Sequence, residues 1–218
     1  MKLITGLYGS TLGKKILMAF TGLLLFGFVL GHMAGNLQLY LGAETYNAYA
    51  HKLQSLGVLL WLIRAVLLSI VAVHIFVAVQ LWLRNRRSRP IKYRVFDPPA
   101  VDYAAKTMVW SGPIIALFII YHLLHFTVGS AHHDFIRGDV YHNVVSSFQL
   151  WWVAGFYIAA NFLLAIHLYH GLWSLFQTFG WDHPRFSNIR RWIAIGFAVL
   201  IGAGNISMPL AVLTGVVR

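Results

Sequence analysis

The chain has 218 residues, of which 59% are hydrophobic and only 11% are charged, against about 25% charged residues in an average soluble domain. Charged side chains are too few to cover the surface of a soluble protein, so the composition indicates a membrane protein. The sequence contains no cysteine, which excludes disulfide scaffolds, thiolate-bound zinc, cysteine-held iron–sulfur clusters and thioether-linked haem. The net charge of +11 is better explained by residues that orient a membrane protein than by nucleic-acid binding.

Five apolar stretches are long enough to cross a bilayer core of about 30 Å, which needs roughly 20 helical residues. In chain order they are Ile16–Tyr40, Leu56–Leu83, Thr107–Val128, Phe148–Phe176 and Trp192–Val217. The first stretch is too long for the apolar core of a signal peptide and no A-x-A-like cleavage site follows it, so we expect it to be retained. The sequence therefore predicts an all-α polytopic membrane protein, with residues 1–218 forming one domain and four of the five helices forming a bundle.

Basic residues lie almost entirely on one side of the five predicted spans. The opposite side carries only Lys52, Arg137 and Arg218, and Arg64 lies within a span. By the positive-inside rule we expect a cytoplasmic N-terminus and an outer C-terminus. Thirteen of the 17 lysines and arginines lie on the cytoplasmic side: Lys2, Lys14, Lys15, Arg84, Arg86, Arg87, Arg89, Lys92, Arg94, Lys106, Arg185, Arg190 and Arg191.

Histidines within the spans point to a site, because ionisable side chains are costly in hydrocarbon and usually mark a function or a buried partner. A helical rise of about 1.5 Å per residue, counted from the cytoplasmic ends, places His32 and His122 roughly 25 Å deep and His74 and His167 roughly 15 Å deep. Four helices thus supply two histidines at each of two levels, about 10 Å apart. This arrangement is typical of two haems, each held between two imidazoles.

The residue types around these histidines favour haem over other metal centres. Zinc or a di-iron centre would add carboxylates or gather more histidines at one level, yet the spans contain no Asp or Glu. The small residues Gly31, Ala34, Gly35 and Gly171 would let the face of a porphyrin come close to the histidines. Two alternatives stay open: histidines that only hydrogen-bond between helices, and a haem-free transporter with proton-relaying histidines, for which no internal repeat is visible.

Four segments carry more specific information: Ser10-Thr11-Leu12-Gly13-Lys14-Lys15, Gly31-His32-Met33-Ala34-Gly35-Asn36-Leu37, Tyr46-Asn47-Ala48-Tyr49-Ala50-His51, and His167-Leu168-Tyr169-His170-Gly171-Leu172-Trp173-Ser174 running on to Gly180-Trp181. In this order they resemble the single-chain, five-helix dihaem cytochrome b subunit of bacterial succinate:quinone oxidoreductases, the succinate dehydrogenases and fumarate reductases. The resemblance covers nearly the whole chain. It implies a membrane anchor with two non-covalent haem b groups, which docks an FAD flavoprotein subunit and an iron–sulfur subunit and exchanges electrons with a quinone, most often menaquinone.

The resemblance also implies the haem ligands. His32, His74 and His167 match the ligands of the first, second and fourth helices, the last through its His-x-x-x-Gly pattern. The third helix offers His122 and His125, and both the His-Leu context and the estimated depth favour His122. His32 and His122 would then hold the outer haem, and His74 and His167 the inner haem.

Two further histidines lie about one helical turn from these ligands. His125 would bond a haem propionate, line a quinone pocket or pack against a neighbouring helix, and His170 faces a similar choice. Some relatives carry a carboxylate for transmembrane proton transfer just before the ligand of the fourth helix. Here that place holds Leu164, Ala165 and Ile166, so we do not expect this pathway.

Quinone chemistry needs hydrogen-bonding groups and access to protons. The candidates near the outer ends of the first two spans are Glu44, His51, Gln54 and Arg64, although Glu44 and His51 also suit a loop and Arg64 would also neutralise a haem propionate. We expect the seven basic residues from Arg84 to Lys106 to contact the iron–sulfur subunit as well as lipid headgroups. A quinone-linked hydrogenase or formate dehydrogenase would use a similar cytochrome b, and the whole complex could form a higher oligomer.

Overall fold

The computed structural model describes residues 9–88 and 103–218, with side chains from residue 107 onward in the second range. The predicted basic residues Lys2, Arg89, Lys92 and Arg94, and the side chain of Lys106, lie outside the described residues. The described part contains seven α-helices and no strand: α2 (Thr11–Asn36), α3 (Ala43–Gln54), α4 (Val58–Arg87), α5 (Tyr103–His122), α6 (Val140–Gln149), α7 (Trp151–Thr178) and α8 (Ser187–Leu213). Three short segments join them: the 3-10 turns η1 (Leu37–Leu41) and η3 (Pro184–Phe186), and the π-helical η2 (Leu123–Val128).

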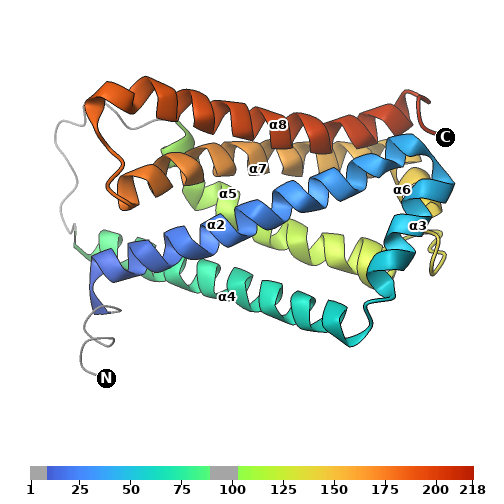
Figure 1. Cartoon of the computed structure of the whole chain (residues 1–218), viewed down its shortest axis with the longest axis horizontal. Coiled ribbons are helices and arrows are strands. Elements are labelled where there is room, and N and C mark those ends of the chain that lie inside the picture. The colour runs from blue at the N-terminus through green and yellow to red at the C-terminus, as the bar shows by residue number, and fades with distance from the viewer. Residues whose placement is uncertain (1–8, 89–102) are drawn as a thin grey trace.

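Five helices are long and apolar enough to cross a membrane, which confirms the predicted all-α fold with five spans. They are α2, α4, α7, α8 and α5 continued by η2, and Figure 1 shows them running along the long axis of the molecule. The predicted boundaries are less accurate. α2 begins at Thr11 rather than Ile16, because the Ser10 hydroxyl accepts the Gly13 N–H at 2.9 Å and starts the helix ahead of the basic pair. α8 likewise begins at Ser187, five residues earlier than predicted.

The sequence predicts Phe148–Phe176 as one continuous span, but the structure has a break in the helix near its start. Leu150 has extended backbone angles, φ −80° and ψ 105°, and separates α6 from α7. The short helices α3 and α6 lie at the same end of the molecule in Figure 1 and pack against each other. We call this the capped end. Hydropathy did not predict either helix as a separate element, because each is short and amphipathic.

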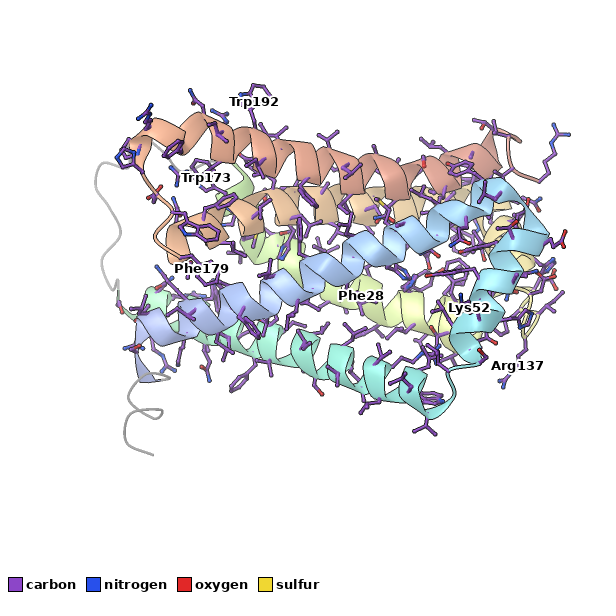
Figure 2. All side chains as sticks on the ribbon, in the orientation of Figure 1. Phe28, Lys52, Arg137, Trp173, Phe179 and Trp192 are labelled. Atoms are coloured by element: carbon purple, nitrogen blue, oxygen red, sulfur yellow. The ribbon has the colours of Figure 1, made fainter. Side chains whose placement is uncertain are left out.

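At the opposite end of the molecule, α2 and α8 begin and α4 and α7 end (Figure 1). We call it the basic end, because most of the described basic residues lie there. Figure 2 shows Lys52 and Arg137 at the capped end, away from Trp173 and Trp192 near the basic end. The described basic residues therefore separate as the sequence indicates. Those of the basic end are Lys14, Lys15, Arg84, Arg86, Arg87, Arg185, Arg190 and Arg191.

Arg190 fixes the turn between α7 and α8. Arg190 is only 6% exposed, and its guanidinium group donates to the carbonyl oxygen of Trp181 at 2.8 Å and to the carboxylate of Asp182. The guanidinium carbon also lies 5.3 Å from the ring centroid of Trp173. A buried guanidinium group is stable only with such partners. The rest of the α7–α8 contact is close, since a Cβ at Gly202 would lie 3.0 Å from that of Ala165.

The remaining helices pack in pairs. α2 packs on α4 and α5 packs on α7, whereas α4 and α5 barely touch each other. Only 6% of the most apolar window of α4, and the same share of that of α5, is buried inside the chain. Apolar helix faces of this size are stable against lipid or partner helices rather than water. The bundle therefore consists of two helix pairs, with α8 added on the outer side of α7.

Asp139 provides a test of the capped end. Its carboxylate accepts the His142 N–H at 2.9 Å as the N-cap of α6, and also accepts the side-chain N–H of Asn47 from α3 at 2.9 Å. The His142 N–H first, and then Asn47, hold the pKa of Asp139 below its ordinary value. A lowered pKa contributes stability that is present above the unfolded pKa, near 4, and is lost as the pH falls through the folded pKa.

We expect Asp139→Ala to destabilise the capped end by about 1 kcal/mol at neutral pH, because it removes the N-cap. The variant should also lose less stability than the wild type on acidification below about pH 4. Hydrogen exchange of the α6 amides at neutral and acid pH measures both effects. Asp134→Ala is the control, because Asp134 pairs with the His142 ring and does not cap α6. Equal exchange in the two variants would contradict this role of Asp139.

Candidate functional site

The imidazole rings of His32 and His122 face each other from α2 and the end of α5. Their centroids are 5.8 Å apart and their planes are nearly perpendicular, at 89°. The His32 ring also stacks on Phe28, at 5.4 Å, which lies midway along α2 in Figure 2. Two imidazoles on opposite sides of one metal ion need about 2 Å for each nitrogen–metal bond. The separation of the two rings fits a single metal ion held between their nitrogens.

His74 of α4 and His167 of α7 form the second pair. These rings interact electrostatically with each other, and both are half-buried. Gly22 of α2 leaves room for His74, because a Cβ at Gly22 would lie 3.4 Å from Cε1 of that ring. The structure thus brings together the same two pairs that the depth estimate predicts, while metal binding by them stays a prediction.

Hydroxyl groups from neighbouring helices hold three of these four imidazoles by Nδ1. Thr21 Oγ1 lies 3.0 Å from Nδ1 of His74, Ser111 Oγ lies 3.4 Å from Nδ1 of His167, and the Tyr157 hydroxyl lies 3.5 Å from Nδ1 of His122. Ligand histidines in metal sites commonly bond a second group through the nitrogen that does not bind the metal, which sets the tautomer and orients the ring.

The bonds of Thr21 indicate which tautomer His74 adopts. The Thr21 hydroxyl donates to its own helix, with the carbonyl oxygens of Leu17 and Met18 at 2.9 and 3.1 Å. Its single proton is used there, so the oxygen accepts the proton of His74 Nδ1. A neutral imidazole protonated on Nδ1 keeps its lone pair on Nε2. His74 is therefore arranged to offer Nε2 to a metal ion.

On α2 and on α5, the residue whose hydroxyl bonds an inner histidine lies on the same helix face as an outer histidine. Thr21 precedes His32 by eleven residues on α2, and Ser111 precedes His122 by eleven residues on α5. Eleven residues make about three turns and a rise of about 16 Å. Each of these helices thus bonds a histidine of one level and supplies a histidine of the other.

The glycines beside the histidines differ in their surroundings. A Cβ at Gly31 or at Gly171 would meet no atom within 4 Å, so the backbone beside His32 and after His167 is open to a flat group. The prediction for Gly35 is wrong. A Cβ there would collide with the ring of Tyr49, so this glycine lets α3 pack on α2.

His125 differs from His122 in that both of its ring nitrogens already have partners. The His125 ring is 1% exposed, with Nδ1 2.9 Å from the Tyr157 hydroxyl and Nε2 3.1 Å from Ser147 Oγ. Using either nitrogen for a metal would break a buried hydrogen bond. The π-helical segment η2 carries His125 and turns it into this network, while His122 closes α5. The geometry thus favours His122 as the ligand.

The predicted quinone residues lie at the capped end but do not form one pocket. Glu44 is in the first turn of α3, His51 and Gln54 are near its end, and all three are exposed. Arg64 is exposed on α4, with its guanidinium carbon 5.0 Å from the ring centroid of Trp61. No hydrogen bond or ion pair joins these four residues in the described part of the chain. His170 lies on α7 and interacts electrostatically with His167.

Sequence reasoning missed the hydroxyl groups Thr21, Ser111, Ser147 and Tyr157. The signal available was their occurrence as polar residues in or beside apolar helices, together with the repeated spacing of eleven residues before a histidine. No group of three or more histidine, cysteine, aspartate or glutamate residues could hold a metal ion within the described residues. Haem needs only two ligands from the protein, because the porphyrin supplies four nitrogens.

Comparisons of the chain with protein-family models, with curated proteins and with solved structures find no match. The functional assignment therefore depends on the geometry of the histidines and on the motifs that carry them.

Replacing Thr21 with valine removes the hydroxyl and keeps the shape of the side chain. In protein without bound metal, we expect the His74 ring to lose its fixed Nδ1–H tautomer, because the hydrogen bond from Nδ1 to Thr21 disappears. Nitrogen NMR of metal-free protein with isotope-labelled histidine would show the two ring signals of His74 moving towards those of a tautomer mixture. Thr214→Val is the control, since the Thr214 hydroxyl also bonds carbonyls of its own helix and α8 carries no histidine. An unchanged His74 spectrum in Thr21→Val would exclude the role given to Thr21.

Proposed function

We propose that the chain is the membrane-anchor and quinone-reactive cytochrome b subunit of a bacterial succinate dehydrogenase or fumarate reductase complex. The observation that supports this best is the presence of two histidine pairs from four apolar helices, with the His32 and His122 rings 5.8 Å apart and three of the four rings held through Nδ1 by hydroxyls. The motifs that resemble this family lie on α2, α3 and α7. The basic end would face the cytoplasm of the bacterial inner membrane, as the positive-inside rule requires.

The residues present fit two non-covalent b haems. His32 and His122 would hold the outer haem, and His74 and His167 the inner one. Haem iron supplies reversible one-electron transfer when it is bound between two imidazoles. Thr21, Ser111 and Tyr157 orient three of the rings, and the apolar helices keep water from the site. Hydrogen bonds accepted from the other ring nitrogen also raise the basicity of the ligating nitrogen.

The two levels give the chain a path for electrons across the bilayer. His32 lies about 16 Å beyond Thr21 along α2, so the histidine pairs span much of the apolar core. We propose that the iron–sulfur subunit docks at the basic end and carries the FAD flavoprotein subunit, where the dicarboxylate chemistry takes place. A quinone, with menaquinone expected, would react near the outer pair, with Glu44, His51, Gln54 and Arg64 as residues of its surroundings at the capped end.

The pairing of ligands predicts the spectra of histidine variants. His32→Ala and His122→Ala should each remove the same component of the reduced-minus-oxidised absorption spectrum, because each removes one of the two histidines that would hold the same haem. His74→Ala and His167→Ala should remove the other component. His125→Gln is the control, since glutamine can still bond Tyr157 and Ser147, and it should keep both components. Loss of one component from both His32→Ala and His74→Ala would contradict the pairing.

The proposed partners are tested by purifying the chain from its native membrane and identifying the subunits that accompany it. We expect a flavoprotein with covalent FAD and an iron–sulfur protein. A hydrogenase or formate dehydrogenase subunit in their place would overturn the proposal, and so would the absence of haem from the intact complex.

The route of electrons gives a separate prediction for the same complex. His32→Ala should reduce an artificial dye with succinate at the wild-type rate, because dye reduction uses the peripheral subunits. It should lose quinone reduction, since the quinone would react at the outer level. Preserved quinone reduction in a variant that retains only its inner haem would place the quinone at the basic end instead.

A further inference from the structure

A polar pocket of about 450 Å³ lies at the capped end. Three segments that are far apart in the chain line it: the connection between η2 and α6, one face of α6, and Arg218, which follows α8. The residues of α6 in its wall are Tyr141, His142, Val145, Ser146 and Gln149. None of the four candidate ligand histidines lines this pocket, so it is a site distinct from the histidine pairs.

The pocket carries charges of both signs. Asp134 and Asp139 supply two carboxylates, and Arg218 supplies a guanidinium group. Asp139 accepts the His142 N–H and the side-chain N–H of Asn47 on the same oxygen, Oδ1. Asp134 bonds the His142 ring through Oδ2, at 2.9 Å. Within the described residues the second oxygen of each carboxylate accepts no hydrogen bond, so both can accept one from a bound molecule.

Arg218 is tied to the wall of the pocket without using its whole guanidinium group. Its Nε donates to the carbonyl oxygen of Gly215 at 2.9 Å, and its own carbonyl oxygen accepts the Tyr141 hydroxyl at 2.9 Å. The two terminal nitrogens of the group donate to no residue in the described part of the chain. A guanidinium fork of this kind matches the oxygens of a phosphate group.

Ser146 adds an unpaired polar atom to the same wall. Its hydroxyl is buried and has no hydrogen-bond partner among the described residues. Buried polar groups nearly always have a partner, which is either protein or a bound molecule. Ser146 lines the pocket, and its hydroxyl turns about a single bond. A molecule in the pocket would therefore supply the missing hydrogen bond.

Exposed tryptophans place the pocket at the level of lipid headgroups. Trp151 and Trp152 start α7 directly after the Gln149 wall and are 77% and 56% exposed. Trp61, in the first turn of α4 at the same end of the molecule (Figure 1), is 67% exposed. Tryptophan side chains gather at the boundary between the hydrocarbon core and the headgroups. The capped end thus presents the pocket to the outer leaflet.

The charges of the pocket select among the molecules found at this level. A headgroup with only a negative charge would meet two carboxylates without a cation to match them. No group of three or more histidine, cysteine, aspartate or glutamate residues could hold a metal ion in the described ranges. A zwitterionic headgroup satisfies both signs, since its phosphate suits a guanidinium group and its ammonium suits carboxylates. A primary ammonium has three N–H donors, whereas a trimethylammonium has none.

We propose that this pocket binds the headgroup of a zwitterionic phospholipid with a primary ammonium group, phosphatidylethanolamine. Arg218 and Ser146 bond the phosphate, and Asp134 and Asp139 bond the ammonium group. The acyl chains extend into the bilayer. The bound lipid joins the connection before α6 to the segment after α8, and it requires neither haem nor quinone.

Lipid binding to the intact protein tests the proposal. The chain is purified with the subunits that accompany it, stripped of loosely held lipid in detergent, and titrated with phospholipids of identical acyl chains. Native mass spectrometry then measures the affinity for each lipid. We expect one phosphatidylethanolamine per chain to bind about 10-fold more tightly than phosphatidylcholine or phosphatidylglycerol. The first competitor lacks N–H donors and the second lacks a cation. Equal affinities for the three lipids would overturn the proposal.

Charge variants locate the site. Arg218→Gln should weaken phosphatidylethanolamine binding about 5-fold, because it removes the partner of the phosphate. Arg137→Gln is the matched control, since Arg137 is an exposed arginine at the same end that does not line the pocket. Asp134→Asn can still accept from the His142 ring but loses its charge, so it should abolish the preference over phosphatidylglycerol. Equal effects of the two arginine variants, or an unchanged preference in Asp134→Asn, would overturn the proposal.

Ser146→Ala separates lipid binding from support of the fold. It removes no hydrogen bond within the described residues, so the thermal stability of the lipid-free protein should equal that of the wild type. Its affinity for phosphatidylethanolamine should fall about 5-fold. Wild-type affinity in this variant would overturn the assignment of the pocket.

A soluble headgroup distinguishes a membrane lipid from a dissolved phosphate ester. Glycerophosphoethanolamine should not displace the bound lipid at equal concentration, because it lacks the acyl chains that hold a lipid in apolar surroundings. Displacement would show that the pocket takes soluble phosphoethanolamine esters and would overturn its assignment to a lipid.

Discussion

The need to satisfy every polar side chain inside an apolar bundle is the constraint on which the rest of this structure depends. An imidazole in hydrocarbon is costly unless its nitrogens find partners. Thr21, Ser111 and Tyr157 provide these partners across helix boundaries. The bonds connect α2 with α4 and α5 with α7, which are the helices that pack as pairs. The hydrogen bonds of the histidines and the pairing of the helices therefore both follow from the need to give buried polar side chains a partner.

The same constraint explains why the site has two levels. α2 and α5 each carry a hydroxyl and, eleven residues later, a histidine, and eleven residues return the helix to nearly the same face about 16 Å further on. α4 and α7 supply the partner histidines, His74 and His167. α8 carries no histidine, and its close contact with α7 and the turn held by Arg190 fix the position of the helix that bears His167 and Tyr157.

The sequence was sufficient for what depends on hydropathy and helical rise, and insufficient for what depends on contacts between distant segments. Span number and the two histidine levels follow from local pattern. The starts of α2 at Thr11 and of α8 at Ser187 do not, because the Ser10 hydroxyl caps α2 ahead of polar residues and α8 continues directly from the 3-10 turn η3. Gly35 was misread because the ring that fills its space, Tyr49, belongs to a helix that folds back. His122 and His125 were hard to separate because the π-helical turn and the partners of His125 are not visible in the sequence.

The two levels differ in what lies behind the imidazoles, although their histidines are arranged alike. At the inner level, Thr21 passes its proton to carbonyls of its own helix, and Ser111 points to Met108 Sδ at 4.0 Å on its own helix. These contacts stay within one turn of the same helix and do not continue to the surface. At the outer level, Tyr157 is bonded to His125, and the bonds continue through Ser147 to the surface. In the described part of the chain, only the outer level has a hydrogen-bonded connection to the capped end. Under the proposed function, chemistry that couples electrons to protons would therefore belong at the outer level, and electron transfer alone at the inner one.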